Sequence, residues 1–327
     1  MQEHPFAQYV RILGKGKTGS RSLTGNEAED AFAMILRGDV EDVQLGAFLM
    51  LLRVKEESSE ELAGFVRAVR ASIPSPDLTV DLDWASYAGK RRQQPWYLLA
   101  ALALADSGVR VVMHGAAGHT AQRIYSEQVL AELGQPLANA LSDVESALNK
   151  GNFAYLPLRV LCPPLQRIID LRNHFGLRSP VHTLARLINP FAAPYSMQSI
   201  FHPAYADSHQ QAAALLGQAN AAVFKGEAGE VERKPEAVCR VKTIINGELG
   251  ETVWPKMVDG RQAWLDTLPI EDLRKAWRQD DISDYGRLAI QGTIAIALHL
   301  RHPERSEDQC LRDAEQIWTD RNRERLS

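Results

Sequence analysis

The chain has 327 residues, with 37 lysines and arginines against 41 aspartates and glutamates, and 45% of its residues are hydrophobic. This composition is that of an ordinary globular protein of roughly two domains, and it excludes a disordered chain and a small disulfide-stapled fold. A formal net charge of -4 excludes a uniformly basic coat protein for nucleic acid, although it says nothing about local patches.

Cysteine use and hydropathy indicate the compartment. Cys162, Cys239 and Cys310 are odd in number and far apart, which favours free thiols in a reducing compartment. The first ten residues lack the basic start and apolar stretch of a secretory signal, and the longest apolar run, Leu98–Ala105, is too short to span a bilayer. We expect a cytoplasmic protein with no membrane segment.

Helical signals dominate the first 73 residues. Thr24 with Glu27 and Ser58 with Glu61 are capping boxes, and Gly14 and Gly38 are helix stops. Apolar residues at helical spacing predict four helices, around residues 6–13, 24–37, 45–52 and 58–73.

From residue 78 onward, short apolar runs alternate with helical patterns, which is typical of a parallel α/β sheet. The runs predict strands at 78–82, 109–113, 153–156 and 221–224, and helices at 96–105, 125–133, 210–216 and 284–300. Because apolar residues recur at helical spacing between 160 and 189, we predict a small all-helical domain of residues 1–73 and 160–189. Residues 74–159 and 190–327 then form a larger α/β domain with a central, mostly parallel sheet.

Two motifs suggest small ligands but fail on their context. Gly14–Gly19 spells GxGxxG with an internal Gly-Lys-Thr, yet it follows a predicted helix, and Arg11 stands where a phosphate loop needs glycine. We interpret it as a glycine-rich turn.

None of the nine histidines lies in a metal-ligand pattern, so we predict no metal site. Tyr87 and Trp96 have two open interpretations, base stacking or burial in the core.

Five separated motifs resemble, in order, the anthranilate phosphoribosyltransferases, also called glycosyltransferase family 3. They are Gln44–Lys55, His114–Gly115, Ile124–Gly134, Arg178–Pro190 and Phe201–Tyr205. The resemblance implies a nucleoside phosphorylase/phosphoribosyltransferase-like fold, with a helical N-terminal domain and an α/β domain. In active members it also implies transfer from phosphoribosyl diphosphate with Mg.

The departures from that family fall on its donor site. Where the family has a Gly-Thr-Gly-Gly-Asp loop, this chain has Ser86–Arg92 with Gly89 as the one glycine. Of the Lys-His-Gly-Asn-Arg motif only the central His-Gly pair is kept, and valine stands inside the acidic metal pair. We therefore predict no catalytic residue and interpret the following as remnants of a degenerate donor site: Gly89, His114, Gly115 and Glu232.

Cations are gained in the same regions, in three clusters: Lys15, Lys17 and Arg21; Lys90, Arg91 and Arg92; and Arg159, Arg167, Arg172, Arg178 and Arg186. Clustered cations attract a polyanion by counterion release, although each cluster could also be a solvated surface balanced by acids. The family resemblance places all three around one cleft, which favours nucleic-acid binding.

This combination resembles the nucleic-acid-binding, YbiB-type subgroup of the family, through the basic loop at 89–91, Leu161–Leu165 and Arg178–Arg186. It implies a non-catalytic protein that binds DNA, single-stranded or without sequence specificity, needs no cofactor, and forms a homodimer through its helical domain. The alternative is a phosphoribosyltransferase that uses phosphoribosyl diphosphate and Mg.

Overall fold

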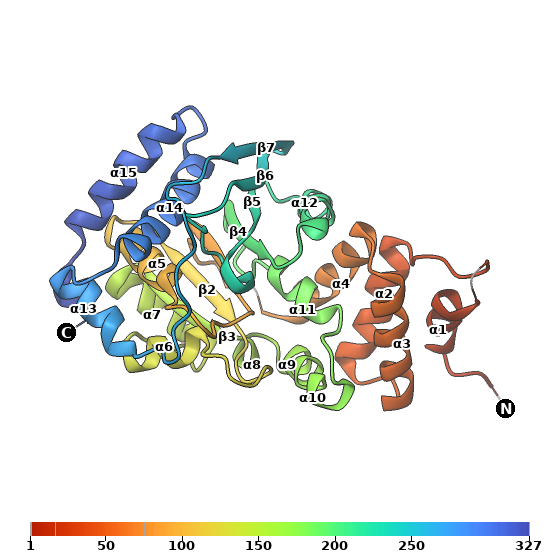
Figure 1. The fold of residues 1–327 in the computed structure, drawn as a ribbon. Coiled ribbons are helices and arrows are strands. Elements are labelled where there is room, and N and C mark those ends of the chain that lie inside the picture. The colour runs from red at the N-terminus through yellow and green to blue at the C-terminus, as the bar shows by residue number, and fades with distance from the viewer. Residues whose placement is uncertain (1, 17, 75, 327) are drawn as a thin grey trace.

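The structure, a computed structural model, describes residues 2–16, 18–74 and 76–326. A helical bundle lies at one end of the molecule and a larger α/β domain at the other (Figure 1). The predicted fold class is confirmed. In the described part of the chain, no helix combines the length and the apolar character needed to cross a membrane.

Four helices form the bundle: α1 (Ala7–Gly14), α2 (Gly25–Arg37), α3 (Asp42–Lys55) and α4 (Ser59–Ser72). Both predicted capping boxes form. Thr24 caps α2 and exchanges hydrogen bonds with Glu27, and Ser58 does the same with Glu61 at the start of α4. Each box satisfies backbone N–H groups that the first turn leaves free.

Helices α2 and α4 approach closely because a glycine lies between them. A Cβ atom built on Gly64 would lie 2.3 Å from the carbonyl oxygen of Gly25 and 2.7 Å from Ala28 Cβ. Beyond this contact, the rings of Phe32 and Phe65 pack with their centroids 5.1 Å apart. The absence of a side chain at Gly64 therefore allows the close approach of the two helices.

The α/β domain is built on a seven-stranded sheet in the order β3-β2-β1-β4-β5-β6-β7. Strands β1 to β5 are parallel, and β6 and β7 continue the sheet as an antiparallel hairpin. Their bounds are β1 Leu82–Ser86, β2 Val111–Gly115, β3 Phe153–Pro157, β4 Tyr195–Ile200, β5 Asn220–Lys225, β6 Cys239–Ile245 and β7 Glu248–Trp254.

Helices cover both faces of the sheet, since alternate strand residues enter two different hydrophobic cores. One core contains α5 (Trp96–Asp106), α13 (Ile270–Gln279), α14 (Asp284–Arg301) and α15 (Glu307–Asp320), together with residues of α6 (Ser126–Glu132). The other contains residues of α7 (Leu141–Gly151) and α12 (Ala206–Leu215) and continues into the helical bundle.

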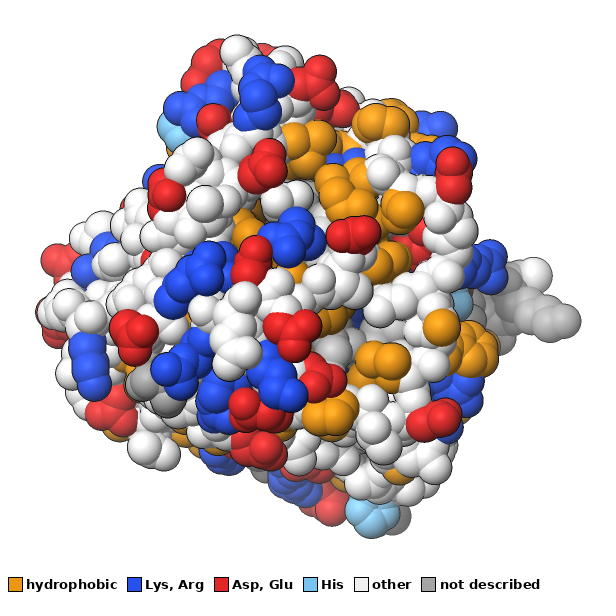
Figure 2. All heavy atoms as spheres, turned by 60° about the vertical axis from the view of Figure 1, so that its left-hand side comes forward, with side chains coloured by type: hydrophobic (Ala, Val, Ile, Leu, Met, Phe, Trp, Pro, Cys, Tyr) orange, Lys and Arg blue, Asp and Glu red, His pale blue; other side chains and the backbone are white. Residues whose placement is uncertain are grey.

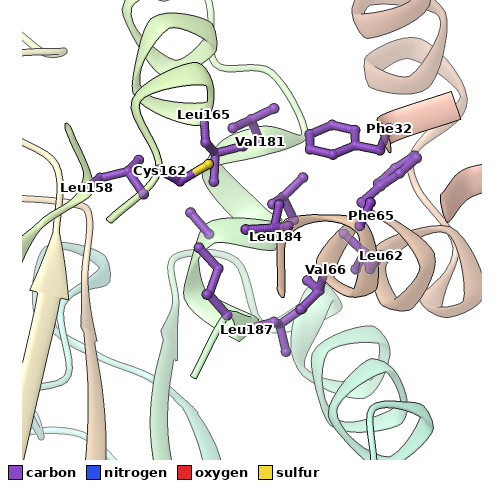
Figure 3. Close-up of a cluster of buried hydrophobic side chains, with 14 of the residues drawn as sticks. Phe32, Leu62, Phe65, Val66, Leu158, Cys162, Leu165, Val181, Leu184 and Leu187 are labelled. Carbon is purple, nitrogen blue, oxygen red and sulfur yellow. The ribbon is translucent and has the colours of Figure 1, made fainter. Parts of the chain in front are cut away.

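The segment that the sequence assigned to the helical domain packs on α2 and α4. It forms α8 (Leu158–Leu161), α9 (Pro163–Asp170), α10 (Arg172–Phe175) and α11 (Val181–Leu184). Figure 3 shows side chains from this segment meeting Phe32 and Phe65 in one buried cluster. Arg70 of α4 also donates to the carbonyl oxygen of Ile188 over 2.7 Å. The exact division into domains stays a prediction.

Several strand positions were predicted wrongly. Strand β1 begins at Leu82, where the predicted strand ended, because its polar residue Asp83 is buried and accepts a hydrogen bond from Ser196 (2.9 Å). Strand β2 lies two residues later than predicted, so His114 and Gly115 are its last residues. Strands β4, β6 and β7 and helices α7, α13 and α15 were not predicted.

Gly64→Ala is expected to lower the free energy of unfolding by about 2 kcal/mol, since the added methyl group meets backbone that cannot yield without moving a helix. Urea unfolding followed by circular dichroism measures this. Gly46→Ala is the matched control: its Cβ would lie 3.8 Å from Phe175, and it gains up to about 1 kcal/mol of helix propensity. Equal effects of the two substitutions would contradict the close packing of α2 on α4.

Candidate functional site

The candidate site lies at the carboxyl ends of the parallel strands, where open α/β sheets hold their ligands. The Ser86–Arg92 loop continues from β1, and the segment Gly226–Glu232 follows β5. These two segments meet beside β2 and β4.

The side chain of Glu230 binds the backbone N–H groups of the loop that follows β1. Glu230 Oε1 accepts hydrogen bonds from the amide nitrogens of Ala88 (2.6 Å) and Gly89 (2.5 Å). We call these two amides the amide cradle. Burial raises the pKa of Glu230, while the Gly89 N–H, Arg186 and the Ala88 N–H oppose that rise. Gly89 has φ +70°, and a Cβ there would lie 2.8 Å from the carbonyl oxygen of Ile124, so the cradle requires glycine.

Lys90 and Glu232 form a buried ion pair beside the cradle, with 2.7 Å between Nζ and Oε1. Glu232 Oε2 also accepts from the backbone nitrogen of Tyr97 (2.9 Å). Burial raises the pKa of Glu232 to about 7, against the opposing effect of Lys90. The prediction that Lys90 contributes to an exposed basic loop is therefore wrong: it is 1% exposed, and its charge is neutralised inside the protein.

Arg123, which the sequence did not suggest as a site residue, joins the two segments. Its Nη1 donates to the carbonyl oxygens of Ala88 (2.9 Å), Gly89 (2.9 Å) and Ala228 (3.3 Å). Lys90 and Ile124 further exchange two backbone hydrogen bonds of 2.8 Å. The loop after β1 is thus held on both sides.

Three of the predicted arginines converge next to Arg123. Arg172 donates to the carbonyl oxygen of His119 (2.7 Å), and Arg186 is buried and donates to that of His182. Arg178 has no ion pair or hydrogen bond with another described residue. Burial is the main cause that lowers the pKa of Arg178 to about 10, and repulsion by Arg186 and Arg123 adds to it. We call these four residues the arginine cluster.

The cluster opens into a cavity of about 140 Å³ that no described aspartate or glutamate lines. Its charged lining residues are Arg53, Arg178 and Arg186. Burial disfavours the charged form of two histidines there, since it lowers the pKa of His182 well below its usual value and that of His209 to about 3. Because guanidinium groups favour anionic ligands, we call this candidate site the anion-binding cavity.

His114 does not face a ligand. It is fully buried on β2, where its Nδ1 lies 2.6 Å from the hydroxyl of Tyr87 and its Nε2 lies 3.2 Å from Asp83 Oδ1. A Cβ on Gly115 would lie 2.1 Å from the carbonyl oxygen of Ser86, so this glycine serves strand packing. Tyr87 (0% exposed) and Trp96 (5%) are buried, which decides against base stacking by either.

The remaining predicted cations do not gather around one cleft. Lys15 and Arg21 are exposed in the segment between α1 and α2, and Figure 1 shows both helices in the bundle at the end of the molecule away from the sheet. Arg21 pairs with Glu27 (2.6 Å). Lys17 lies outside the described residues. Arg159 pairs with Glu127 and Arg167 with Asp42, each over 2.7 Å. Figure 2 shows Lys and Arg side chains interspersed with Asp and Glu.

Arg91 and Arg92 are exposed and form no ion pair with any residue that the structure describes. Of the other predicted cations, Lys15, Arg172, Arg178 and Arg186 also form no ion pair with a described residue. Among residues 2–16, 18–74 and 76–326 there is no group of three or more His, Cys, Asp or Glu side chains placed to hold a metal ion.

Comparison with known proteins places these features in a family. The profile of the helical bundle domain of the glycosyl transferase family matches residues 8–73, and that of its a/b domain matches residues 97–273. The uncharacterized protein YbiB of Escherichia coli K12 is 28% identical over 245 residues, 73% of this chain and 76% of the relative. The anthranilate phosphoribosyltransferase of Methylocella silvestris is 29% identical over 240 residues, 73% of this chain and 68% of the enzyme.

Solved structures agree on the fold. Anthranilate phosphoribosyltransferase (TrpD) from Thermus thermophilus matches with a TM-score of 0.77 at 22% identity, over 97% of this chain and 94% of the enzyme. The Saccharomyces cerevisiae enzyme in complex with PRPP and Mg gives a TM-score of 0.80 at 18% identity, over 99% and 96% of the two chains.

Protonation of His119 is expected to destabilise the site. Burial lowers the pKa of His119 to about 3, and repulsion by the positive charge of Arg178 is the second cause. Because an unfolded histidine titrates near pH 6.5, the unfolded chain binds more protons below that pH, and stability falls by up to about 1.4 kcal/mol per pH unit as pH drops toward 4. His119→Gln removes this contribution.

Urea unfolding at pH 7 and pH 4.5 checks the expectation. The variant should lose less stability than the natural chain between the two values, and His174→Gln, at an exposed position, should behave like the natural chain. An identical acid response in His119→Gln would contradict the neutral buried state of His119.

Proposed function

The chain belongs to the glycosyl transferase family that joins a helical bundle to an α/β domain, and from that premise we propose that it is a non-catalytic nucleic-acid-binding protein. Its ligand would be DNA, single-stranded or without sequence specificity, bound by cations at the carboxyl edge of the sheet.

The observation that carries the proposal is the amide cradle filled by Glu230. Backbone N–H groups of a glycine loop can bind a diphosphate only when no other anion occupies them. Here a carboxylate accepts from both Ala88 and Gly89, and a second carboxylate, Glu232, is paired with Lys90 rather than free for a metal. The chain thus supplies its own anions where a phosphoribosyl donor and its metal would need open groups.

Cations that could reach a phosphate backbone surround this closed site. Arg91 and Arg92 are exposed on the loop after β1, and Arg178 faces the anion-binding cavity. These contacts are to charge rather than to base edges, so they support affinity without sequence readout. The chain is similar to relatives named anthranilate phosphoribosyltransferase. It is also similar to YbiB, itself uncharacterized, over three quarters of the length of YbiB.

A homodimer through the helical bundle is part of the proposal. Helix α3 buries Leu45, Phe48, Leu49 and Leu52 on one face. Its opposite face carries Val43 (79% exposed) and Val54 (85% exposed), with Ala47 between them. An apolar stripe on the solvent side of a helix favours burial against a second copy, and a dimer would double the cations presented to one strand.

Binding of a fluorescent single-stranded oligonucleotide is expected to weaken steeply with salt. Replacing Arg91 and Arg92 together with alanine should weaken binding at low salt and reduce the slope of log K against log salt by about 0.7 for each phosphate that the variant no longer neutralises. Fluorescence anisotropy across salt concentrations measures both effects.

Arg312→Ala is the matched control, because Arg312 is an exposed arginine on α15. Its slope should equal that of the natural chain. Absence of binding at low salt would exclude the proposed function, and an unchanged slope in the double variant would remove the loop after β1 from the interface.

The competing function is phosphoribosyl transfer, and Glu230 separates the two. Glu230→Ala frees the amide cradle, so inorganic diphosphate is expected to raise the melting temperature of this variant but not of the natural chain. Glu230→Gln keeps an acceptor oxygen of the same reach and should not gain the effect.

Calorimetry with phosphoribosyl diphosphate and Mg completes this test on the natural chain. Weak or absent heat agrees with a closed donor site. Tight, metal-dependent binding would instead favour the enzyme and show that Glu230 yields to the donor.

A further inference from the structure

A second recess adjoins the candidate site, and neither the amide cradle nor the arginine cluster lines it. It is a groove of about 920 Å³ between the loop after β4, the loop after β5, strand β6 and the segment that contains Trp264. It shares Gly226, Glu227 and Ala228 with the candidate site. Three large hydrophobic side chains line it and are exposed: Phe201 (48%), Val238 (58%) and Trp264 (70%). We call it the aromatic groove.

Trp264 is held in place although it is exposed. The guanidinium carbon of Arg92 lies 4.2 Å from the centroid of its ring, within the range of a cation–π contact. The next residue, Leu265, donates its backbone N–H to the carbonyl oxygen of Arg92 (2.9 Å). An indole that keeps 70% of its surface in solvent is a platform on which a planar ring can stack.

The charges of the groove favour an anionic ligand. Each of the four acids of its lining contacts a cation: Lys234 lies 3.0 Å from Glu227 and 3.5 Å from Glu236, and Lys242 lies 2.8 Å from Asp207 and 2.9 Å from Glu251. Arg240, also in the lining, lies 2.8 Å from Glu251, so these three cations offset all but one of the four negative charges. Lys225 and Arg261 also line the groove, are exposed, and pair with no acid in the described part of the chain. With these two residues the lining holds five cations against four acids, so its net charge is positive by one.

The groove adjoins the anion-binding cavity. Ile200 and Phe201 line both, so the half-exposed ring of Phe201 stands between the arginine cluster and Trp264. Phosphates placed on Arg178 and on Arg92 or Lys225 would leave the intervening bases beside two aromatic rings.

We propose that the aromatic groove binds unpaired bases of a single-stranded nucleic acid, with one base stacked on Trp264 and the flanking phosphates on Arg92, Lys225 and Arg261. This inference rests on the proposed function and adds to it a site and a preference for single strands. Bases already stacked in a duplex cannot reach the indole, whereas unpaired bases can, whatever their identity.

Intrinsic fluorescence gives a selective test, since Trp264 is the exposed one among the six tryptophans and the others are at most 5% exposed. An unlabelled single-stranded oligothymidylate is titrated into the full chain at low salt. Stacking is expected to quench the exposed tryptophan and to protect it from acrylamide. A duplex of the same length should do neither.

Trp264→Leu is expected to abolish the quenching and to weaken binding of a labelled single strand about tenfold, the effect of losing one stacked base. Trp264→Phe, which keeps a ring, should recover most of the affinity. Leu249→Ala removes an exposed apolar side chain of β7 outside the groove and should change neither.

The outcomes separate the two proposals. Salt-dependent binding without quenching, and with unchanged affinity in Trp264→Leu, overturns the groove and leaves the proposed function standing. Equal quenching by duplex overturns the preference for single strands. Absence of binding by anisotropy at low salt overturns the proposed function and the groove together.

Discussion

The hydrogen bonds from Ala88 and Gly89 to Glu230 organise the carboxyl edge of the sheet. A backbone loop that presents two buried N–H groups in one direction needs an acceptor, because buried donors without an acceptor are costly. Here the acceptor belongs to the protein, so the two N–H groups are satisfied without a ligand. Arg123 and the Lys90–Glu232 ion pair reinforce the same arrangement, since they also hold the loop after β1 against the segment after β5.

Charge in this molecule is divided between an inner and an outer population. Among the inner groups, Lys90 and Glu232 pair with each other, and Glu230 accepts from two backbone amides, so both carboxyl groups hold loops together. Of the outer cations, some pair with acids, as Arg159 does with Glu127, whereas Arg92 and Arg178 lack acid partners among the described residues. Net charge averages over both populations and therefore carries little information on ligands, while the pairing of each cation decides whether it can meet a phosphate.

Local signals in the sequence were enough for the helical bundle, whose capping boxes at Thr24 and Ser58 form as predicted. Strand β1 was misplaced because buried Asp83 resembles a loop residue. The β6–β7 hairpin was missed although Asn246-Gly247, both at positive φ, is a strong turn signal. The burial of Lys90 could not be predicted, because its partner Glu232 is 142 residues away and three adjacent cations in a sequence resemble a surface patch.

That separation also bears on how the molecule folds. Strand β1 lies between β2 and β4 in the sheet, and Glu230 follows β5, so the contacts at the carboxyl edge close only after most of the chain has been synthesised. Contacts of such long range form slowly, since the intervening chain must first be ordered. Until then Lys90 and Glu232 stay hydrated, and their desolvation falls on a late step of folding. Mutations at this ion pair should therefore act mainly on the rate of unfolding, with the early helical bundle left intact.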